Sequence, residues 1–180
     1  MKKRRNIVFV AKSLDGFIAD KNGGLVWLQS TPNPDQLDMG YEKFIGGVDA
    51  IVMGRNTFET VCGFDIEWPY SKPVFVMSRT LDSLPEKYQN NAALVKGTIS
   101  EILNELEQKG YTSLYIDGGT TVQSFLKEDL IDEMIITTIP ILLGGGVPLF
   151  SDLTGKLEFE HVESQVFLNE IVQDHYRRKR

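Results

Sequence analysis

Residues 114–122, which read Leu-Tyr-Ile-Asp-Gly-Gly-Thr-Thr-Val, constrain the fold of this chain most strongly. The apolar residues predict a buried strand that ends in a turn of two glycines and continues as a helix. Glycine has no Cβ atom to keep the backbone away from a ligand, and the first amides of a helix carry the positive end of its dipole. The stretch predicts either an anion site, most often for phosphate, or only a tight turn of an α/β protein.

Two further predicted strands end in polar sequences of the same kind. Residues 49–53 run into Gly-Arg-Asn-Thr at 54–57, and residues 74–77 run into Ser-Arg-Thr at 78–80. Arginine and hydroxyl groups together suit a phosphate monoester. Because ligands of open α/β sheets bind at the carboxyl ends of strands, we expect the three junctions to converge on one elongated ligand, such as a dinucleotide. The sequence contains neither the Gly-x-Gly-x-x-Gly fingerprint nor the lysine of a P-loop.

Strands that alternate with helices predict an α/β fold with a mostly parallel central sheet flanked by helices. Apolar runs predict strands over residues 6–11, 49–53, 74–77, 92–95, 114–117 and 133–139. Helices are expected after the N-caps Asn33 and Ser100 and after the glycine junctions, and the first helix should bury a stripe over residues 37–48. Residues 157–166 and 170–176 alternate in polarity and predict a closing antiparallel hairpin.

The composition fits one domain over residues 1–180. With 42% hydrophobic residues, a chain of 180 residues can bury one good core. A single cysteine, Cys62, excludes an internal disulfide, and His161 and His175 lack neighbouring cysteines that would complete a metal site. No apolar run approaches the length of a membrane span, so we expect a cytoplasmic protein without a metal ion.

Charge is distributed unevenly along the chain. The runs 2–5 and 177–180 hold eight of the 19 Lys and Arg residues, which leaves 11 basic against 25 acidic residues in the interior. An acidic body argues against a nucleic-acid groove, and we expect the basic ends to be solvated tails. The interior has only two arginines, Arg55 and Arg79, and both lie at predicted junctions, which favours a role for them in binding.

Four motifs resemble the dihydrofolate reductase superfamily along nearly the whole chain. They are, in order, residues 11–27, 51–59, 78–80 and 118–119. Ser-Leu-Asp-Gly at 13–16 and the stretch 141–150 are similar to the branch that contains the reductase domain of riboflavin biosynthesis, the RibD C-terminal domain. The resemblance implies a single-domain dihydrofolate reductase-like fold, an NADPH cofactor and a homodimer.

The resemblance also implies a place for each part of the cofactor. It assigns the phosphates to Gly54, Arg55, Asn56 and Thr57, and the ribose with its 2′-phosphate to Ser78 and Arg79. It assigns the pyrophosphate to Gly118, Gly119, Thr120 and Thr121. It places the nicotinamide beside Ala11, Gly16 and Ile18.

The sequence departs from dihydrofolate reductases where a proton donor is expected. In that family a carboxylate follows the tryptophan closely, whereas residues 28–34 intervene after Trp27 here. The candidate catalytic acids are Asp38, which would border the core face of the predicted helix, and Asp15, near the expected nicotinamide. An ordinary surface aspartate is the alternative for Asp38, and Asp117 is expected only to hold its turn. Trp27 is either a core plug or a wall of the site.

Together these features predict an NADPH-dependent reductase that transfers hydride to a pterin-like or ribosylaminopyrimidine-like heterocycle. Dihydrofolate itself should be a poor substrate, because no third interior arginine is left to hold its glutamate tail. The alternative is a non-catalytic dinucleotide-binding protein, which would keep the three junctions but lack a working proton donor.

Overall fold

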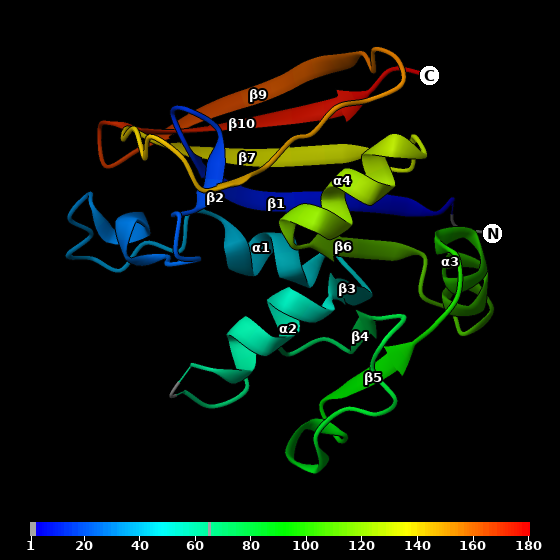
Figure 1. Ribbon diagram of the computed structural model, residues 1–180. Coiled ribbons are helices and arrows are strands. Elements are labelled where there is room, and N and C mark those ends of the chain that lie inside the picture. Colours follow the sequence, from blue (N-terminus) through cyan, green and yellow to red (C-terminus); the bar gives the residue numbers. More distant parts are fainter. Residues whose placement is uncertain (1–2, 65) are drawn as a thin grey trace.

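One eight-stranded sheet carries the fold, with its strands in the order β5-β4-β3-β6-β1-β7-β10-β9 (Figure 1). The computed structural model describes residues 3–64 and 66–180, so Met1, Lys2 and Asp65 lie outside the described residues. Every pairing from β5 to β7 is parallel, and β10 is antiparallel to both β7 and β9. The predicted α/β fold, with a mostly parallel sheet and a C-terminal antiparallel hairpin, is confirmed.

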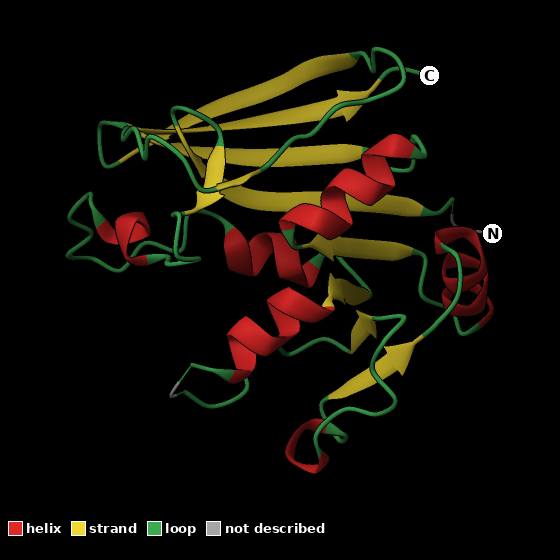
Figure 2. Ribbon diagram, in the orientation of Figure 1, coloured by secondary structure: helices red, strands yellow, loops and turns green. Residues whose placement is uncertain are grey.

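The helices and strands have the following bounds (Figure 2). The parallel strands are β1 (Arg5–Ser13), β3 (Ala50–Gly54), β4 (Val74–Met77), β5 (Ala92–Val95), β6 (Ser113–Asp117) and β7 (Glu133–Ile139). The hairpin is β9 (Phe159–Phe167) and β10 (Ile171–Arg178), and β2 (Phe17–Ala19) pairs with β8 (Val147–Pro148) in a separate small sheet. The helices are α1 (Tyr41–Gly46), α2 (Arg55–Cys62), α3 (Ile99–Gln108) and α4 (Gly119–Lys127), with 3-10 turns η1 (Val26–Gln29) and η2 (Glu86–Tyr88). Within the described residues, no helix has the length and apolar character needed to cross a membrane.

Two helices pack on each face of the sheet and enclose separate cores. On one face, α3 and α4 pack onto strand residues such as Ile116, with Phe125 fully buried. On the other face, α1 and α2 pack onto strand residues such as Tyr115, with Phe44 of α1 in the core. Because side chains alternate along a strand, Asp117 points to the same face as Tyr115, toward α1 and α2.

The helix predicted from Asn33 is wrong, because α1 begins only at Tyr41. The Asn33 side chain accepts a hydrogen bond from the Leu37 amide and donates one to the Leu37 carbonyl, which closes a local turn in place of a helix. Gly40 then adopts a left-handed conformation, with φ +85°, directly before α1. Leu37, predicted to lie on the buried stripe, is exposed as a result.

The predicted cap of α3 is also displaced. The N-cap is Thr98, not Ser100. Thr98 accepts a hydrogen bond from the Glu101 amide, and the Glu101 carboxylate accepts one from the Thr98 amide, so the helix starts with a capping box. Ser100 instead lies within the first turn of the helix.

Trp27 is a core residue and not an exposed wall. Its side chain is 8% exposed and packs with Ile139 and Ile171 in a small cluster under the 20–40 segment. The indole Nε1 donates to the Gly24 carbonyl at 3.2 Å. This cluster joins the segment before α1 to the hairpin end of the sheet.

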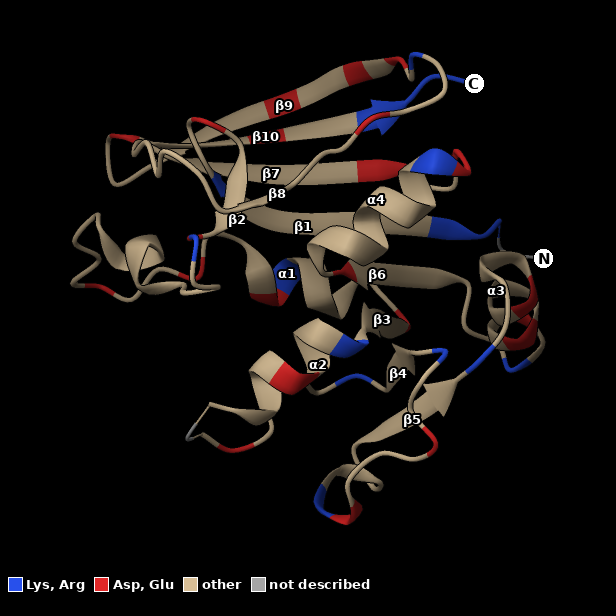
Figure 3. Cartoon of the chain, in the orientation of Figure 1, with Lys and Arg blue, Asp and Glu red and all other residues tan. Residues whose placement is uncertain are grey.

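Basic residues of both ends lie at the amino edge of the sheet, where the parallel strands begin (Figure 3). Their arginines form ion pairs there, so these parts of the basic runs are not solvated tails. At the start of the chain, Arg5 contacts Glu133, the first residue of β7, at 3.4 Å. At its end, Arg177 contacts Glu160 at 3.5 Å. Pairing with acidic neighbours explains why these charges sit on ordered strands.

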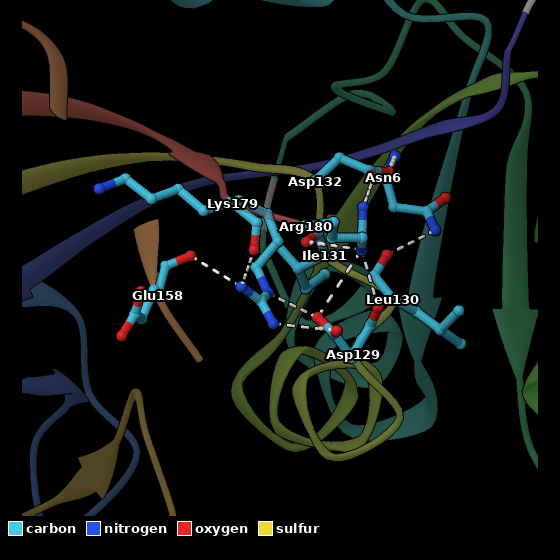
Figure 4. Close-up of polar contacts among 9 residues, drawn as sticks. Asn6, Asp129, Leu130, Ile131, Asp132, Glu158, Lys179 and Arg180 are labelled. Atoms are coloured by element: carbon cyan, nitrogen blue, oxygen red, sulfur yellow. Dashed lines mark hydrogen bonds and ion pairs between the residues drawn. The ribbon is translucent and has the colours of Figure 1, made fainter. Parts of the chain in front are cut away.

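A denser cluster joins the last residues of the chain to the turn between α4 and β7 (Figure 4). Arg178 forms two parallel bonds to Asp129, Nε to Oδ1 at 2.7 Å and a second guanidinium nitrogen to Oδ2 at 3.0 Å. Arg180 contacts Asp132, whose other oxygen accepts the Asn6 amide at 2.8 Å. We call residues 129–132 with 178–180 the terminal clamp. It fixes the turn at the far end of α4 from Gly118 and Gly119.

Candidate active site

Two of the predicted junctions touch at the carboxyl edge of the sheet, where the parallel strands end. Strands β3 and β6 are neighbours, with Met53 opposite Asp117. A Cβ atom on Gly118 would overlap Thr57 Oγ1, and one on Gly54 would lie 2.7 Å from Thr121 Oγ1. Each glycine therefore makes room for a hydroxyl of the opposite junction. Four predicted binding residues come together here as expected from the topology.

The third junction is joined to the other two through Arg55. The Arg55 guanidinium donates to Glu59 at 2.6 Å and to Thr80 Oγ1 at 3.2 Å, so the starts of α2 and the 78–80 turn are linked. Ser78 Oγ accepts the amides of Thr80 and Leu81. Both bonds use its lone pairs, so its own hydrogen stays available to a ligand.

Arg79 is a cation at this edge that forms no ion pair among the described residues. Its side chain is exposed, and no ion pair joins it to another residue within 3–64 and 66–180. Arg55, in contrast, is already paired with Glu59. Of the two interior arginines, Arg79 is the better placed to meet an anion from solution.

The starts of α2 and α4 fit a diphosphate group. Their N-caps are Gly54 and Gly118, and neither cap supplies a side-chain acceptor for the first amides of its helix. Asn56 and Thr120 lie exposed in these first turns. Free amides at two helix starts that face one strand edge, with no Cβ at either cap, form a cradle suited to an extended anion.

The predicted nicotinamide residues lie in and beside the small β2–β8 sheet. Gly16 has φ +88°, and its carbonyl accepts the Leu149 amide at 2.9 Å. Ile18 covers the first residue of α4, because a Cβ on Gly119 would lie 2.7 Å from Ile18 Cδ1. A side chain at position 119 would collide with Ile18, so packing favours glycine at this position. Ala11 lies near the end of β1, half-buried beside the Trp27 cluster.

Asp15 holds two loops together. Its Oδ2 accepts the Gly144 amide at 2.7 Å, and its Oδ1 accepts the Leu143 amide at 3.1 Å and the Ser13 hydroxyl at 2.6 Å. The Ser13 hydroxyl and these amides lower the pKa of the Asp15 carboxyl. A carboxylate stabilised in this way is a poor proton donor.

Asp38 bonds the first turn of α1 from outside the helix, whereas it was predicted to border the core face of a helix. It precedes α1, and its carboxylate accepts the amides of Glu42 at 2.8 Å and of Gly40 at 3.0 Å. The side chain is exposed, and the Glu42 amide, followed by that of Gly40, lowers its pKa. The ordinary structural role, left open by the sequence, is the one observed.

Asp117 is the carboxyl group that sequence reasoning undervalued. It is the last residue of β6, half-buried, and faces α1 and α2 directly before the two glycines. Burial raises its pKa to about 6, although the Gly118 amide and the Tyr115 hydroxyl oppose the shift. An acid of this kind retains a proton close to neutral pH and can give it to a ligand.

Three tyrosines interact electrostatically with Asp117. Burial first, and then the Asp117 carboxylate, raise the pKa of Tyr41, Tyr70 and Tyr115. The Tyr115 hydroxyl donates to the Phe9 carbonyl at 3.0 Å. The sequence did contain a signal, because Tyr115 and Asp117 alternate on one strand and Asp117 stands at its carboxyl end. The contributions of Tyr41 and Tyr70 come from distant segments and carried no such signal.

A surface hollow of about 470 Å³ lies beyond the end of α2, away from the three junctions. Trp68, Lys87 and Tyr88 are among the residues that line it, and none of the predicted site residues does. Among the described residues that line it, the acidic side chain, Glu67, is exposed. The hollow therefore differs from the carboxyl edge, where Asp117 is half-buried.

The fold and this edge define an α/β protein of the dihydrofolate reductase type. The sequence model of the RibD C-terminal domain family matches residues 5–173, so the chain belongs to that family. The uncharacterized protein YwjB of Bacillus subtilis is 34% identical over 176 residues, covering 97% of this chain and 98% of YwjB.

Solved structures agree with this assignment. A putative riboflavin biosynthesis protein from Shewanella sp. PV-4 is 55% identical, with a TM-score of 0.96 over 98% of this chain and 99% of the other. A diaminohydroxyphosphoribosylaminopyrimidine deaminase/5-amino-6-(5-phosphoribosylamino)uracil reductase from Thermotoga maritima gives 0.76 at 17% identity, over 99% of this chain but 57% of the other. Dihydrofolate reductase from Enterococcus faecalis, complexed with NADP(H), gives 0.68 at 17% identity over 98% and 97%. The last two likenesses show a shared fold.

Proposed function

We propose that this protein is an NADPH-dependent reductase that transfers hydride to a small heterocycle. The observation that carries the proposal is the meeting of three strand ends, with Gly54, Thr57, Gly118 and Thr121 in contact and Arg55 bonded to Thr80. Family membership supports reductase chemistry in general. NADPH and the substrate are the finer parts of the proposal.

Each part of the edge has a role in holding the cofactor. The phosphates bind at the starts of α2 and α4. The residues of these two starts are Gly54, Arg55, Asn56, Thr57, Gly118, Gly119, Thr120 and Thr121. Ser78 and Arg79 bind the 2′-phosphate through a hydroxyl and a guanidinium. Ala11, Gly16 and Ile18 position the nicotinamide at the β2 side and exclude water from it.

We assign proton donation to Asp117 in place of Asp15 and Asp38, whose carboxylates are committed to backbone amides. Bound NADPH supplies a hydride, that is, a proton with two electrons, to the electron-poor carbon of a C=N bond. The electron pair of that double bond moves to the nitrogen, and Asp117 gives its proton to the same nitrogen. Asp117 is left as a carboxylate and recovers a proton from water.

Single-turnover oxidation of bound NADPH tests the proposal. Enzyme mixed with one equivalent of NADPH should lose absorbance at the reduced nicotinamide band when a tail-less dihydropterin or an aminopyrimidine is added, and NADH should bind far more weakly. Tight NADPH binding without oxidation by any member of the panel would favour the non-catalytic alternative. Failure to bind NADPH would contradict both.

We also propose that two copies associate through β9, as a cytoplasmic homodimer. Strand β9 is an edge strand of nine residues, and Val166 on it is 62% exposed. Unpaired edge groups and exposed valines favour pairing with a second chain. Sedimentation equilibrium should give twice the chain mass, and Val166→Lys should shift the protein to monomer, with Lys127→Ala on α4 as a control that leaves the mass unchanged.

A further inference from the structure

We infer that the substrate is a heterocycle without a phosphate or carboxylate group, held through a nitrogen-bound hydrogen by Asp117. The inference rests on the proposed reductase function and narrows its substrate class. It separates this chain from its Thermotoga relative, because the reductase named there acts on a phosphoribosylamino compound.

Neutral rings lie on the face of the sheet that Asp117 shares with α1 and α2. Phe9 of β1 stacks on Phe44 of α1, with ring centroids 4.7 Å apart, and Phe44 meets Tyr115 edge-on at 5.0 Å. Tyr41 lies 5.7 Å from Phe9. Phe44 and Tyr115 are buried beneath this face, whereas Phe9, Tyr41 and Asp117 are partly exposed on it. Uncharged rings beside one carboxyl group suit a flat, uncharged ring system.

Tyr70 adds a ring from the loop after α2. It packs on Trp68 at 5.4 Å and against the same core as Tyr115. Its hydroxyl interacts electrostatically with Asp117. The face therefore receives side chains from β1, β6, α1 and this loop, and each one except Asp117 is neutral.

The nearest cations of the described chain are directed elsewhere. Lys12 and Val10 share one face of β1, and Val10 packs with the core that contains α4. Lys12 is therefore on the face of the sheet opposite to Asp117. Lys43 stands two residues after Tyr41 in α1, on the side away from Tyr41 and Phe44. Lys21 runs along Gly145 in the outer loop.

Lys72 stands two residues after Tyr70 in the loop after α2 and lines, with Tyr70, a separate hollow beside Asn90 and Ala92. Arg55 and Arg79 lie at the cofactor junctions, and the arginines of the terminal clamp lie at the opposite edge of the sheet. None of the residues that shift the pKa of Asp117 is a cation. A phosphate or carboxylate placed on this face of the sheet would lose water without gaining a cation, and the Asp117 carboxylate would repel it.

Matched substrate pairs test the inference. 5-Amino-6-ribosylaminouracil is compared with its 5′-phosphate, and a tail-less dihydropterin with dihydrofolate, by steady-state NADPH oxidation and by calorimetric binding to the NADP⁺-loaded protein. In each pair the member without the anionic group should bind and react at least about tenfold better. Equal values, a preference for the anionic member, or no reaction with either member would overturn the inference.

Added charge gives a second, independent test. Tyr70→Lys and Tyr41→Lys, on separate elements, should each improve binding of the anionic member relative to its partner by about tenfold, while Thr60→Lys on the exposed side of α2 should leave that ratio unchanged. An unchanged ratio in folded Tyr70→Lys and Tyr41→Lys would contradict the inference. NADPH titration of the same variants reports separately on the proposed function, because cofactor binding can persist while the substrate preference fails.

Discussion

The two edges of the central sheet use polar residues in opposite ways. At the amino edge, several charges are paired with opposite charges, as in Arg5 with Glu133 and Arg178 with Asp129. At the carboxyl edge, the starts of α2 and α4 lack side-chain caps, Arg79 is exposed, and no cation among the described residues shifts the pKa of the half-buried Asp117. The difference indicates that one edge contributes stability, whereas the other keeps unsatisfied groups for a ligand.

Removing the acid should produce the largest effect at the carboxyl edge. Asp117→Asn keeps the size of the side chain but cannot donate a proton to the substrate nitrogen, so kcat should fall by about 10²–10³-fold. Stopped-flow oxidation of NADPH measures the loss. Asp38→Asn, which alters only the cap of α1, should leave kcat close to the native value, and similar losses in both variants would contradict the assignment to Asp117.

Asp117→Asn should raise the free energy of unfolding, although it lowers kcat. The pKa of Asp117 is raised to about 6 in the folded protein, so the folded state binds more protons than the unfolded state between about pH 4 and 6, and the free energy of unfolding falls as pH rises through that range. Asp117→Asn removes the penalty and should add ~2 kcal/mol at pH 8 and almost nothing at pH 3.5. Urea unfolding at both pH values measures this difference, and a stability loss at pH 8 would refute the buried-acid account.

The pH dependence of catalysis should follow the same group. The value of kcat/KM should decline above about pH 6 in the native protein and lose that dependence in Asp117→Asn.

Removing the unpaired cation should have the next largest effect. Arg79→Ala removes a charge-assisted contact to the 2′-phosphate and should weaken NADPH binding by about 10–100-fold, with NADH nearly unaffected. Fluorescence titration of the reduced nicotinamide measures both affinities. Lys87→Ala, at the distant hollow, serves as the matched control. Equal losses for NADPH and NADH would rule out a 2′-phosphate contact.

At the amino edge, a charge change should alter stability and spare binding. The Arg178 side chain is 11% exposed and bonds both oxygens of Asp129, so Arg178→Met should lower the free energy of unfolding by about 2 kcal/mol. Its neighbour Arg177 is 52% exposed and makes one long contact, so Arg177→Met should cost less than about 1 kcal/mol. Thermal unfolding compares the two variants. A weaker NADPH affinity in Arg178→Met would show that the edges are not independent.

The sequence predicted the carboxyl edge better than the amino edge for a physical reason. Strand ends such as Met53 with Gly54 combine an apolar run and a glycine within a few residues, so local pattern is enough to place them. The terminal clamp joins residues more than forty positions apart, and only the antiparallel return of β10 brings Arg178 to Asp129. Charge runs alone could not reveal that pairing.

The predicted placement of Asp38 was wrong for a similar reason. Asp38 was placed by assuming that a helical repeat began at Asn33, but the Asn33 side chain bonds Leu37 and closes a turn first. Local hydrogen bonding by Asn and Asp competes with helix formation, and apolar spacing does not report it. The pKa of Asp117 depends on burial by segments far away in the sequence, which composition cannot express.

Hydrogen–deuterium exchange of the native protein with and without NADPH tests the contrast between the two edges most directly. NADPH should slow exchange at the amides of residues 54–57, 78–80 and 118–122, where the helix starts meet, and leave the amides of residues 129–132 and 178–180 in the terminal clamp unchanged. Protection confined to the hollow near Trp68 and Tyr88, or spread equally over both edges, would contradict the account.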